Sequence, residues 1–169
     1  MTDQLPKRKN IRLKEYDYST PGAYFVTICT QNRKHLLSKI HVVGAGVLDR
    51  PLVELLSHGV VADRYIRQMD AHYDDLSVDA YVIMPNHIHL LIRIHDDGRS
   101  GTPAPTKGNA VLARFVSTFK RFCNKEYGDN IWQRGFYDHV VRDRSDYDDV
   151  YRYIETNPTQ WELDEFYVQ

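Results

Sequence analysis

The sequence has few cysteines, no long apolar run and almost no net charge, and each shortage excludes a class of protein. Its two cysteines, Cys29 and Cys123, cannot form a disulfide framework or a cysteine-only metal site, and they fit a reducing compartment. No apolar run approaches the roughly 20 residues that span a bilayer, and the first residues lack the apolar stretch of a signal peptide. We therefore expect a cytoplasmic protein with no membrane partner.

The net charge of -1 gives no global sign of nucleic-acid binding, so such a function must rest on local clusters. The 169 residues suit a single domain spanning the whole chain, 1–169. Hydrophobic residues make up 42% and charged residues 27%, which is enough for a core with a soluble surface and excludes a disordered or fibrous chain.

The apolar periodicity predicts an α+β fold. The expected strands are 23–31, 76–84, 87–94 and 136–142, and the expected helices are 49–69, 109–125 and 145–157. Residues 32–50 are ambiguous and could include a hairpin, whereas 96–108 are rich in Gly, Pro and Ser and predict a flexible loop. This order favours a ferredoxin-like or RRM-like antiparallel sheet, with two helices on its aliphatic face and the last, tyrosine-bearing helix on the other.

Two histidines lie on one face of the predicted strand 87–94. The period of two puts His87 and His89 on one side of the strand and Ile88 with the other aliphatic residues on the opposite side. Two imidazoles so placed can bind one metal ion and leave further positions for another protein group, water or substrate. The alternative is a pair of half-buried or surface histidines with no ligand.

A phenol and an amide share one face of the predicted last helix. Tyr153 and Asn157 are four residues apart, which places them one turn from each other. Asn157 can give a carbonyl oxygen to a metal ion, and Tyr153 can present its hydroxyl to a phosphate bound to that ion. The alternative is that Tyr153 packs in the core and Asn157 ends the helix before Pro158.

Two groups of basic residues are candidates for DNA contacts. A predicted basic arm, residues 1–22, carries no opposing acid from position 7 to 14, and a second group lies along the predicted helix 109–125. Both could contact a phosphate backbone, although ordinary solvated charge is the alternative for the helix. The arm residues are Lys7, Arg8, Lys9, Arg12 and Lys14, and the helix residues are Arg114, Arg121 and Lys125.

Three segments together resemble a known family. Residues 81–92 (YVIMPNHIHLLI), 132–139 (WQRGFYDH) and 153–158 (YIETNP) resemble, in this order, the motifs of the REP-associated tyrosine transposases. REP stands for repeated extragenic palindrome. These proteins belong to the single-tyrosine HUH endonucleases, named for two histidines that flank a hydrophobic residue.

The resemblance implies a nucleoid-associated enzyme that cuts and rejoins single-stranded DNA next to hairpins formed by palindromic repeats. By position, His87 and His89 match the metal-binding pair, Tyr153 matches the nucleophile that forms a 5′-phosphotyrosine link, and Asn157 takes the place of the third polar ligand. That ligand is usually glutamine in the insertion-sequence relatives. Mg²⁺ or Mn²⁺ is the expected ion, although the residues also suit Zn²⁺. Both monomers and homodimers fit the resemblance.

Two alternatives belong to other functional classes. The predicted element order also fits a non-catalytic RRM-like nucleic-acid-binding protein, in which exposed aromatic residues of the sheet stack on bases. Histidines at positions 87 and 89 suit a cation better than a base-stacking surface, and this favours the enzyme. A domesticated relative that binds hairpins without cutting them is the second alternative.

Overall fold

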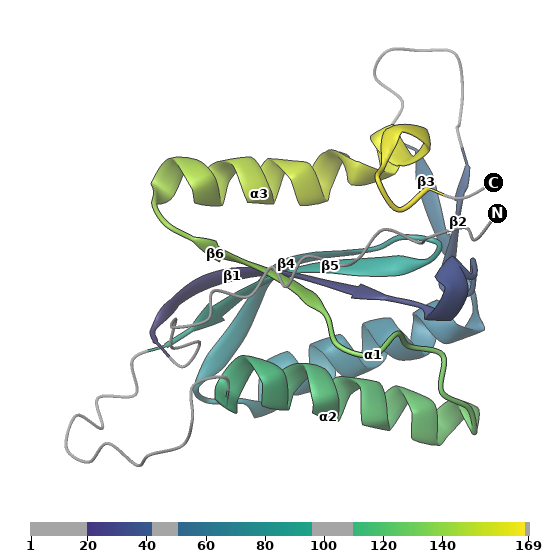
Figure 1. Cartoon of the computed structure of the whole chain (residues 1–169), viewed down its shortest axis with the longest axis horizontal. Helices are drawn as coiled ribbons and strands as arrows, with labels where there is room; N and C mark the ends of the chain where they lie inside the picture. The colour runs from purple at the N-terminus through teal and green to yellow at the C-terminus, as the bar shows by residue number, and fades with distance from the viewer. Residues whose placement is uncertain (1–19, 42–50, 96–109, 168–169) are drawn as a thin grey trace, which may run out of the picture.

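The computed structural model describes residues 20–41, 51–95 and 110–167, which form an α+β fold around a four-stranded antiparallel sheet (Figure 1). The strand order is β4-β5-β1-β6, and helices α1 and α2 lie on one face of the sheet while α3 lies on the other (Figure 1). The elements are β1 (Gly22–Cys29), the 3-10 turn η1 (Gln31–Arg33), β2 (Ser38–His41), β3 (Leu52–Leu55), α1 (Ser57–His72), β4 (Leu76–Ile83), β5 (His87–Ile94), α2 (Ala110–Tyr127), β6 (Tyr137–Val141), α3 (Arg144–Thr156) and the 3-10 turn η2 (Asn157–Leu163). The predicted ferredoxin-like arrangement is confirmed.

The main core lies between the sheet and helices α1 and α2. Strand β5 contributes Ile88, Leu90 and Ile92, which are fully buried against apolar residues of both helices. Burial of one such side chain contributes about 1.5–3 kcal/mol, so this aliphatic face fixes which side of the sheet the two helices cover. The same alternation turns His87 and His89 toward α3 and the C-terminal turn.

Helix α3 covers the opposite face of the sheet, mainly over β4 and β5. Its buried Ile154 packs with Ala23 and Leu91 of the sheet in a second, smaller apolar cluster. The helix is capped by Asp143, whose carboxylate accepts a hydrogen bond of 2.9 Å from the backbone N–H of Asp146. The helix therefore begins at Arg144, one residue before the predicted start at 145.

The start of the first helix also differs from the prediction. Leu52–Leu55 form strand β3, which pairs with Ser38–His41 of β2, and α1 begins only at Ser57. Leu52 is 59% exposed, whereas Leu55 is partly buried against the main core, so the leucine spacing there belongs to a strand and not to a helical stripe. The hairpin considered for residues 32–50 is thus present in part, formed by β2 and β3.

Several predicted segments lie outside the described residues. They are the basic arm with Lys7, Arg8, Lys9, Arg12 and Lys14, the expected helix entry at Asp49, and the loop 96–108. Within the part of the chain that the structure describes, none of the helices combines the length and apolar character that crossing a bilayer requires.

Candidate functional site

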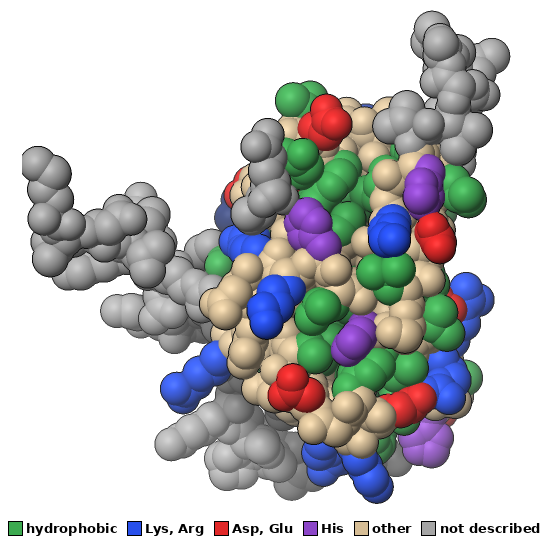
Figure 2. All heavy atoms as spheres, turned by 90° about the vertical axis from the view of Figure 1, so that its right-hand side faces the viewer, with side chains coloured by type: hydrophobic (Ala, Val, Ile, Leu, Met, Phe, Trp, Pro, Cys, Tyr) green, Lys and Arg blue, Asp and Glu red, His purple; other side chains and the backbone are tan. Residues whose placement is uncertain are grey.

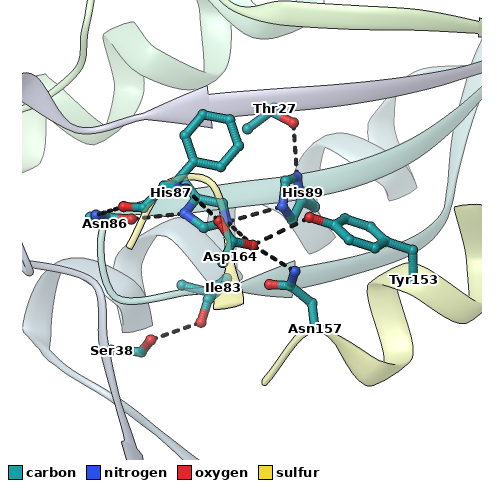
Figure 3. A network of polar contacts seen from close by, with 10 residues as sticks. Thr27, Ser38, Ile83, Asn86, His87, His89, Tyr153, Asn157 and Asp164 are labelled. Atoms are coloured by element: carbon teal, nitrogen blue, oxygen red, sulfur yellow. Dashed lines mark hydrogen bonds and ion pairs between the residues drawn. The ribbon is translucent and has the colours of Figure 1, made fainter. Parts of the chain in front are cut away.

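The histidine pair lies at the centre of the sheet, where β5 runs between β4 and β1. The side chains of His87 and His89 are 0% and 1% exposed, and their Nε2 atoms are 3.0 Å apart (Figure 3). Surface histidines are thereby excluded as an interpretation. Burial lowers the pKa of His89 to about 4, and burial together with the neighbouring imidazole lowers the pKa of His87 well below its ordinary value. Both rings are neutral at physiological pH.

Neighbouring polar groups orient both rings. The side-chain amide of Asn86 donates to the backbone carbonyl of Phe166 over 2.8 Å, so its oxygen faces His87 Nδ1 at 2.8 Å and accepts the proton there. His87 therefore keeps a free electron pair at Nε2. His89 Nδ1 lies 2.8 Å from the hydroxyl of Thr27, which can either donate or accept.

The free electron pair of His87 points at Nε2 of His89, and this contact has two favourable forms. Either His89 carries its proton on Nε2 and donates it to His87, or it carries the proton on Nδ1 and both Nε2 atoms face a shared cation. The rotating hydroxyl of Thr27 satisfies His89 Nδ1 in both forms. Such outer hydrogen bonds are typical of metal-binding histidines, whose ring orientation and tautomer they fix.

A carboxylate completes the cluster from the C-terminal end of the described chain. The turn η2 reverses the chain after α3 and brings Asp164 over the histidine pair, with its side chain fully buried and Oδ2 3.9 Å from His87 Nε2 (Figure 3). Ligand atoms of His87, His89 and Asp164 all lie within 4.8 Å of one another. Sequence reasoning missed Asp164, because it belongs to no motif and no helical or strand spacing links it to the histidines.

Helix α3 and the start of η2 bring Tyr153 and Asn157 to the same place (Figure 3). The hydroxyl of Tyr153 donates to Asp164 Oδ2 over 3.3 Å, and its ring lies edge-on to His89 with the ring centroids 5.3 Å apart. Asn157 Nδ2 donates to the same carboxylate oxygen over 2.8 Å. The four-residue spacing thus brings both side chains to the histidines, as the sequence predicts.

Two features of these side chains bear on their chemistry. Partial burial, and then the negative charge of Asp164, raise the pKa of the Tyr153 phenol, which therefore holds its proton at neutral pH. The side-chain oxygen of Asn157 is buried and has no hydrogen-bond partner among the described residues. An unpartnered buried acceptor costs about 1–3 kcal/mol, so this oxygen is suited to a group that binds there.

The predicted basic stripe lies away from this site. Arg114, Arg121 and Lys125 belong to α2, on the face of the sheet opposite the histidines (Figure 1). Arg114 is paired with Asp75 over 2.6 Å. Figure 2 shows basic side chains scattered among acidic, histidine and apolar ones at the end of the molecule where β2 and β3 lie, with no continuous basic surface in that view. These three residues cannot act at the cluster around His87.

His139, in the segment WQRGFYDH, had no predicted role. It lies on β6 and its Nε2 contacts Asp146 of α3 over 2.9 Å, which ties the start of that helix to the edge strand.

Comparison with known proteins finds several sequence relatives of this chain. No family model matches it. An uncharacterised protein of Haemophilus influenzae is 32% identical over 178 residues, which cover 95% of this chain and 93% of the relative. A candidate REP-associated tyrosine transposase of the same organism is 28% identical and covers 85% of this chain and 74% of its own length. The REP-associated tyrosine transposase of Escherichia coli is 22% identical, covering 85% of this chain and 70% of its own.

A solved structure is similar to the fold. A REP-associated tyrosine transposase bound to a REP hairpin superimposes with a TM-score of 0.62 at 18% identity, over 91% of this chain and 76% of that one. At this identity the match shows a shared fold. Named relatives that match over 85% of the chain agree with the resemblance of the three motifs, and the chain is similar in sequence and in fold to REP-associated tyrosine transposases.

Proposed function

We propose that the protein is a metal-dependent endonuclease and strand transferase that cuts single-stranded DNA next to a hairpin through a covalent link to Tyr153. The observation that carries this proposal is the meeting of the Tyr153 hydroxyl, the two histidine Nε2 atoms and the Asp164 carboxylate in one small cluster. The solved relative bound to a REP hairpin supports hairpin DNA as the partner.

The residues present fit a divalent cation. His87 and His89 would hold it through Nε2, and the carboxylate of Asp164 or the unpartnered oxygen of Asn157 would add an oxygen ligand. Mixed nitrogen and oxygen donors suit Mn²⁺ and also accept Mg²⁺ or Zn²⁺. When bound, such an ion polarises the scissile phosphate and stabilises its developing negative charge.

The reaction of Tyr153 exchanges one phosphate ester for another. The phenolic oxygen attacks the phosphorus, the bond from phosphorus to the 3′ oxygen breaks, and the DNA is left with a free 3′ hydroxyl and a 5′-phosphotyrosine. Because the pKa of Tyr153 is raised, the phenol must lose its proton during attack, and the Asp164 carboxylate at 3.3 Å is within reach to accept it. A proton taken up by the leaving 3′ oxygen balances the step, which needs no ATP and is reversible.

The site is built within one chain, because α3 packs on the sheet of its own chain and carries Tyr153 to its own histidines. This supports a single-domain enzyme that can act as a monomer. Contacts of the basic arm and of Arg114, Arg121 and Lys125 with DNA remain part of the proposal, the latter three only for DNA that reaches the α2 face.

A covalent adduct tests the function. A labelled single-stranded oligonucleotide that carries the palindromes next to the protein's own gene is incubated with the protein and Mn²⁺, and denaturing electrophoresis should show a slow-migrating species. Tyr153→Phe should abolish it, whereas the matched variant Tyr151→Phe, which alters an exposed tyrosine of the same helix, should not. An adduct that persists in Tyr153→Phe would exclude the assigned nucleophile.

His87→Ala separates chemistry from binding. The variant should no longer form the adduct, but a gel-shift assay should still detect its binding to the hairpin. In the proposal the histidines take part in the cutting reaction and do not contact the hairpin stem. Equal loss of cutting and binding would mean that the pair is structural.

A further inference from the structure

Helix α3 carries the candidate nucleophile, but its apolar contacts with the sheet are few. Of its residues, all of which the structure describes, only Ile154 is buried, and the apolar cluster that it joins is small. Burial of apolar surface is non-directional, so such a cluster leaves a helix free to slide or turn by a fraction of a residue. An accurate position for the Tyr153 hydroxyl therefore needs directional contacts elsewhere on α3.

A hydrogen-bonded cluster supplies such contacts near the start of the helix. The hydroxyl of Tyr147 donates to Oδ2 of Asp79 on β4 over 2.8 Å. Arg93 of β5 donates to the same oxygen from Nε over 2.9 Å and from Nη2 over 2.7 Å, and its guanidinium lies 5.1 Å from the centre of the Tyr147 ring. The Ser77 hydroxyl donates to the other carboxylate oxygen over 3.1 Å. We call Asp79, Arg93 and Tyr147 the α3 clamp.

An irregularity in β4 turns Asp79 toward the helix. Val78 and Ala80 pair with consecutive residues of β5, so Asp79 is the extra residue of a β-bulge between them. Val78 before the bulge and Tyr81 after it both pack against the main core. The two residues between them therefore face the other side of the sheet, which α3 covers (Figure 1). The bulge thus aims a carboxylate at Tyr147.

The clamp and the candidate site lie on the same two elements. Strand β5 carries both Arg93 and His89, and α3 carries both Tyr147 and Tyr153. The two tyrosines are separated by about 9 Å along the helix axis, at 1.5 Å per residue. Over so short a length a helix moves nearly as a rigid rod, so a shift of α3 at the clamp also displaces the Tyr153 hydroxyl.

We propose that Asp79 and Arg93, acting through Tyr147, are positioning residues for the proposed nucleophile; this inference rests on the proposed function. Their contacts fix the rotation of α3 and its position along β5, and so hold the Tyr153 ring beside His89, with the ring centroids 5.3 Å apart. A displacement of about 1 Å from the line of attack can slow such a reaction about a hundredfold. The clamp should therefore govern the rate of cutting and not the binding of DNA.

A role in stability alone is the alternative, and Tyr81 offers the matched comparison. Its hydroxyl donates to Asp63 of α1 over 2.6 Å, so it also joins β4 to a helix, but on the opposite face of the sheet. Tyr147→Phe and Tyr81→Phe each remove one hydrogen bond from a tyrosine to an aspartate, and both should lower the midpoint of urea unfolding to a similar extent. Only the first of the two bonds involves the helix that carries Tyr153.

Single-turnover kinetics tests the proposal. The rate of adduct formation is measured with Mn²⁺ and a saturating amount of the oligonucleotide of the adduct assay, and binding is measured by gel shift in EDTA. Tyr147→Phe should slow the adduct about tenfold or more and change the dissociation constant by less than about twofold, whereas Tyr81→Phe should change neither. Asp79→Ala should slow it at least as much, and adding Tyr147→Phe to Asp79→Ala should slow it no further, because both changes remove the same hydrogen bond. If Asp79→Ala does not fold, Tyr147→Phe decides alone.

NMR of the DNA-free protein, isotope-labelled at the tyrosine Cζ atoms, tests the positioning without any cutting. Tyr153→Phe identifies the Tyr153 signal, which should shift or broaden in Tyr147→Phe and stay in place in Tyr81→Phe. An unchanged Tyr153 signal in Tyr147→Phe would overturn the proposal, as would equal rate losses in the two variants or a parallel loss of DNA binding. If the wild-type protein forms no adduct, the proposed function fails, and the NMR comparison still decides whether the clamp positions Tyr153.

Discussion

Acidification of the metal-free protein should destabilise it through the buried histidines. In the folded chain His89 is neutral, with a pKa of about 4, while in the unfolded chain its pKa returns to about 6.5. Below about pH 6.5, His89 therefore binds a proton when the chain unfolds, because the buried imidazole of the folded chain does not bind it. The free energy of unfolding is unaffected above that pH and falls as the pH drops from about 6.5 toward 4.

The size of the loss follows from the two pKa values. At about pH 5 the unfolded imidazole is almost fully protonated and the folded one almost fully neutral, and the difference in proton affinity corresponds to about 2 kcal/mol. Burial and the neighbouring His89 also lower the pKa of His87 well below its ordinary value, so His87 acts in the same direction. Asp146 and Glu126, the carboxylates with lowered pKa values, lose their contribution to the free energy of unfolding only at lower pH. The pH range from about 6.5 to about 5 therefore reports on the histidines.

Urea unfolding in EDTA at about pH 7 and about pH 5 measures this effect. The wild-type protein should lose at least about 2 kcal/mol between the two, and His89→Gln should lose about 2 kcal/mol less than the wild type does. His72→Gln, which alters an exposed histidine at the end of α1, should leave the pH dependence unchanged. An equal pH dependence in wild type and His89→Gln would refute the reasoning, because it would mean that His89 is not held neutral by burial.

Three further substitutions test the fold and the site. Gly59→Ala should cost about 3 kcal/mol or more in urea unfolding, because its Cβ would lie 1.9 Å from the carbonyl oxygen of Leu37. Tyr147→Phe removes a hydrogen bond of 2.8 Å to Asp79 that joins α3 to the sheet, so the free energy of unfolding should fall by about 1–2 kcal/mol and amide exchange in α3 should accelerate. Asn157→Ala should weaken Mn²⁺ binding about tenfold in an EPR titration. An unchanged affinity would mean that Asn157 neither binds the ion nor orients one of its ligands.

The sequence predicted those features that depend on local spacing. Strand β5 alternates an aliphatic face with a histidine face, and only one side of such a strand can enter the main core, so the direction of both histidines followed directly. Tyr153 and Asn157 met the histidines because the helical path continues through Thr156 into the first residue of η2. The predicted start of α1 was wrong for a related reason, because the leucine spacing before Ser57 is compatible with a helix and also with a short strand.

The part of the site that was missed, Asp164, comes from a chain reversal, where spacing carries no information. Asp164 reaches the histidines only because η2 turns the chain back over the sheet. This turn leaves no periodic pattern, and an acidic residue after a proline-containing turn is most often a solvated charge. Asp164 is nevertheless buried, and burial of a carboxylate is costly unless charged or hydrogen-bonding groups compensate. The donors that Tyr153 and Asn157 supply are part of this compensation, and the cation proposed between the histidines would add to it.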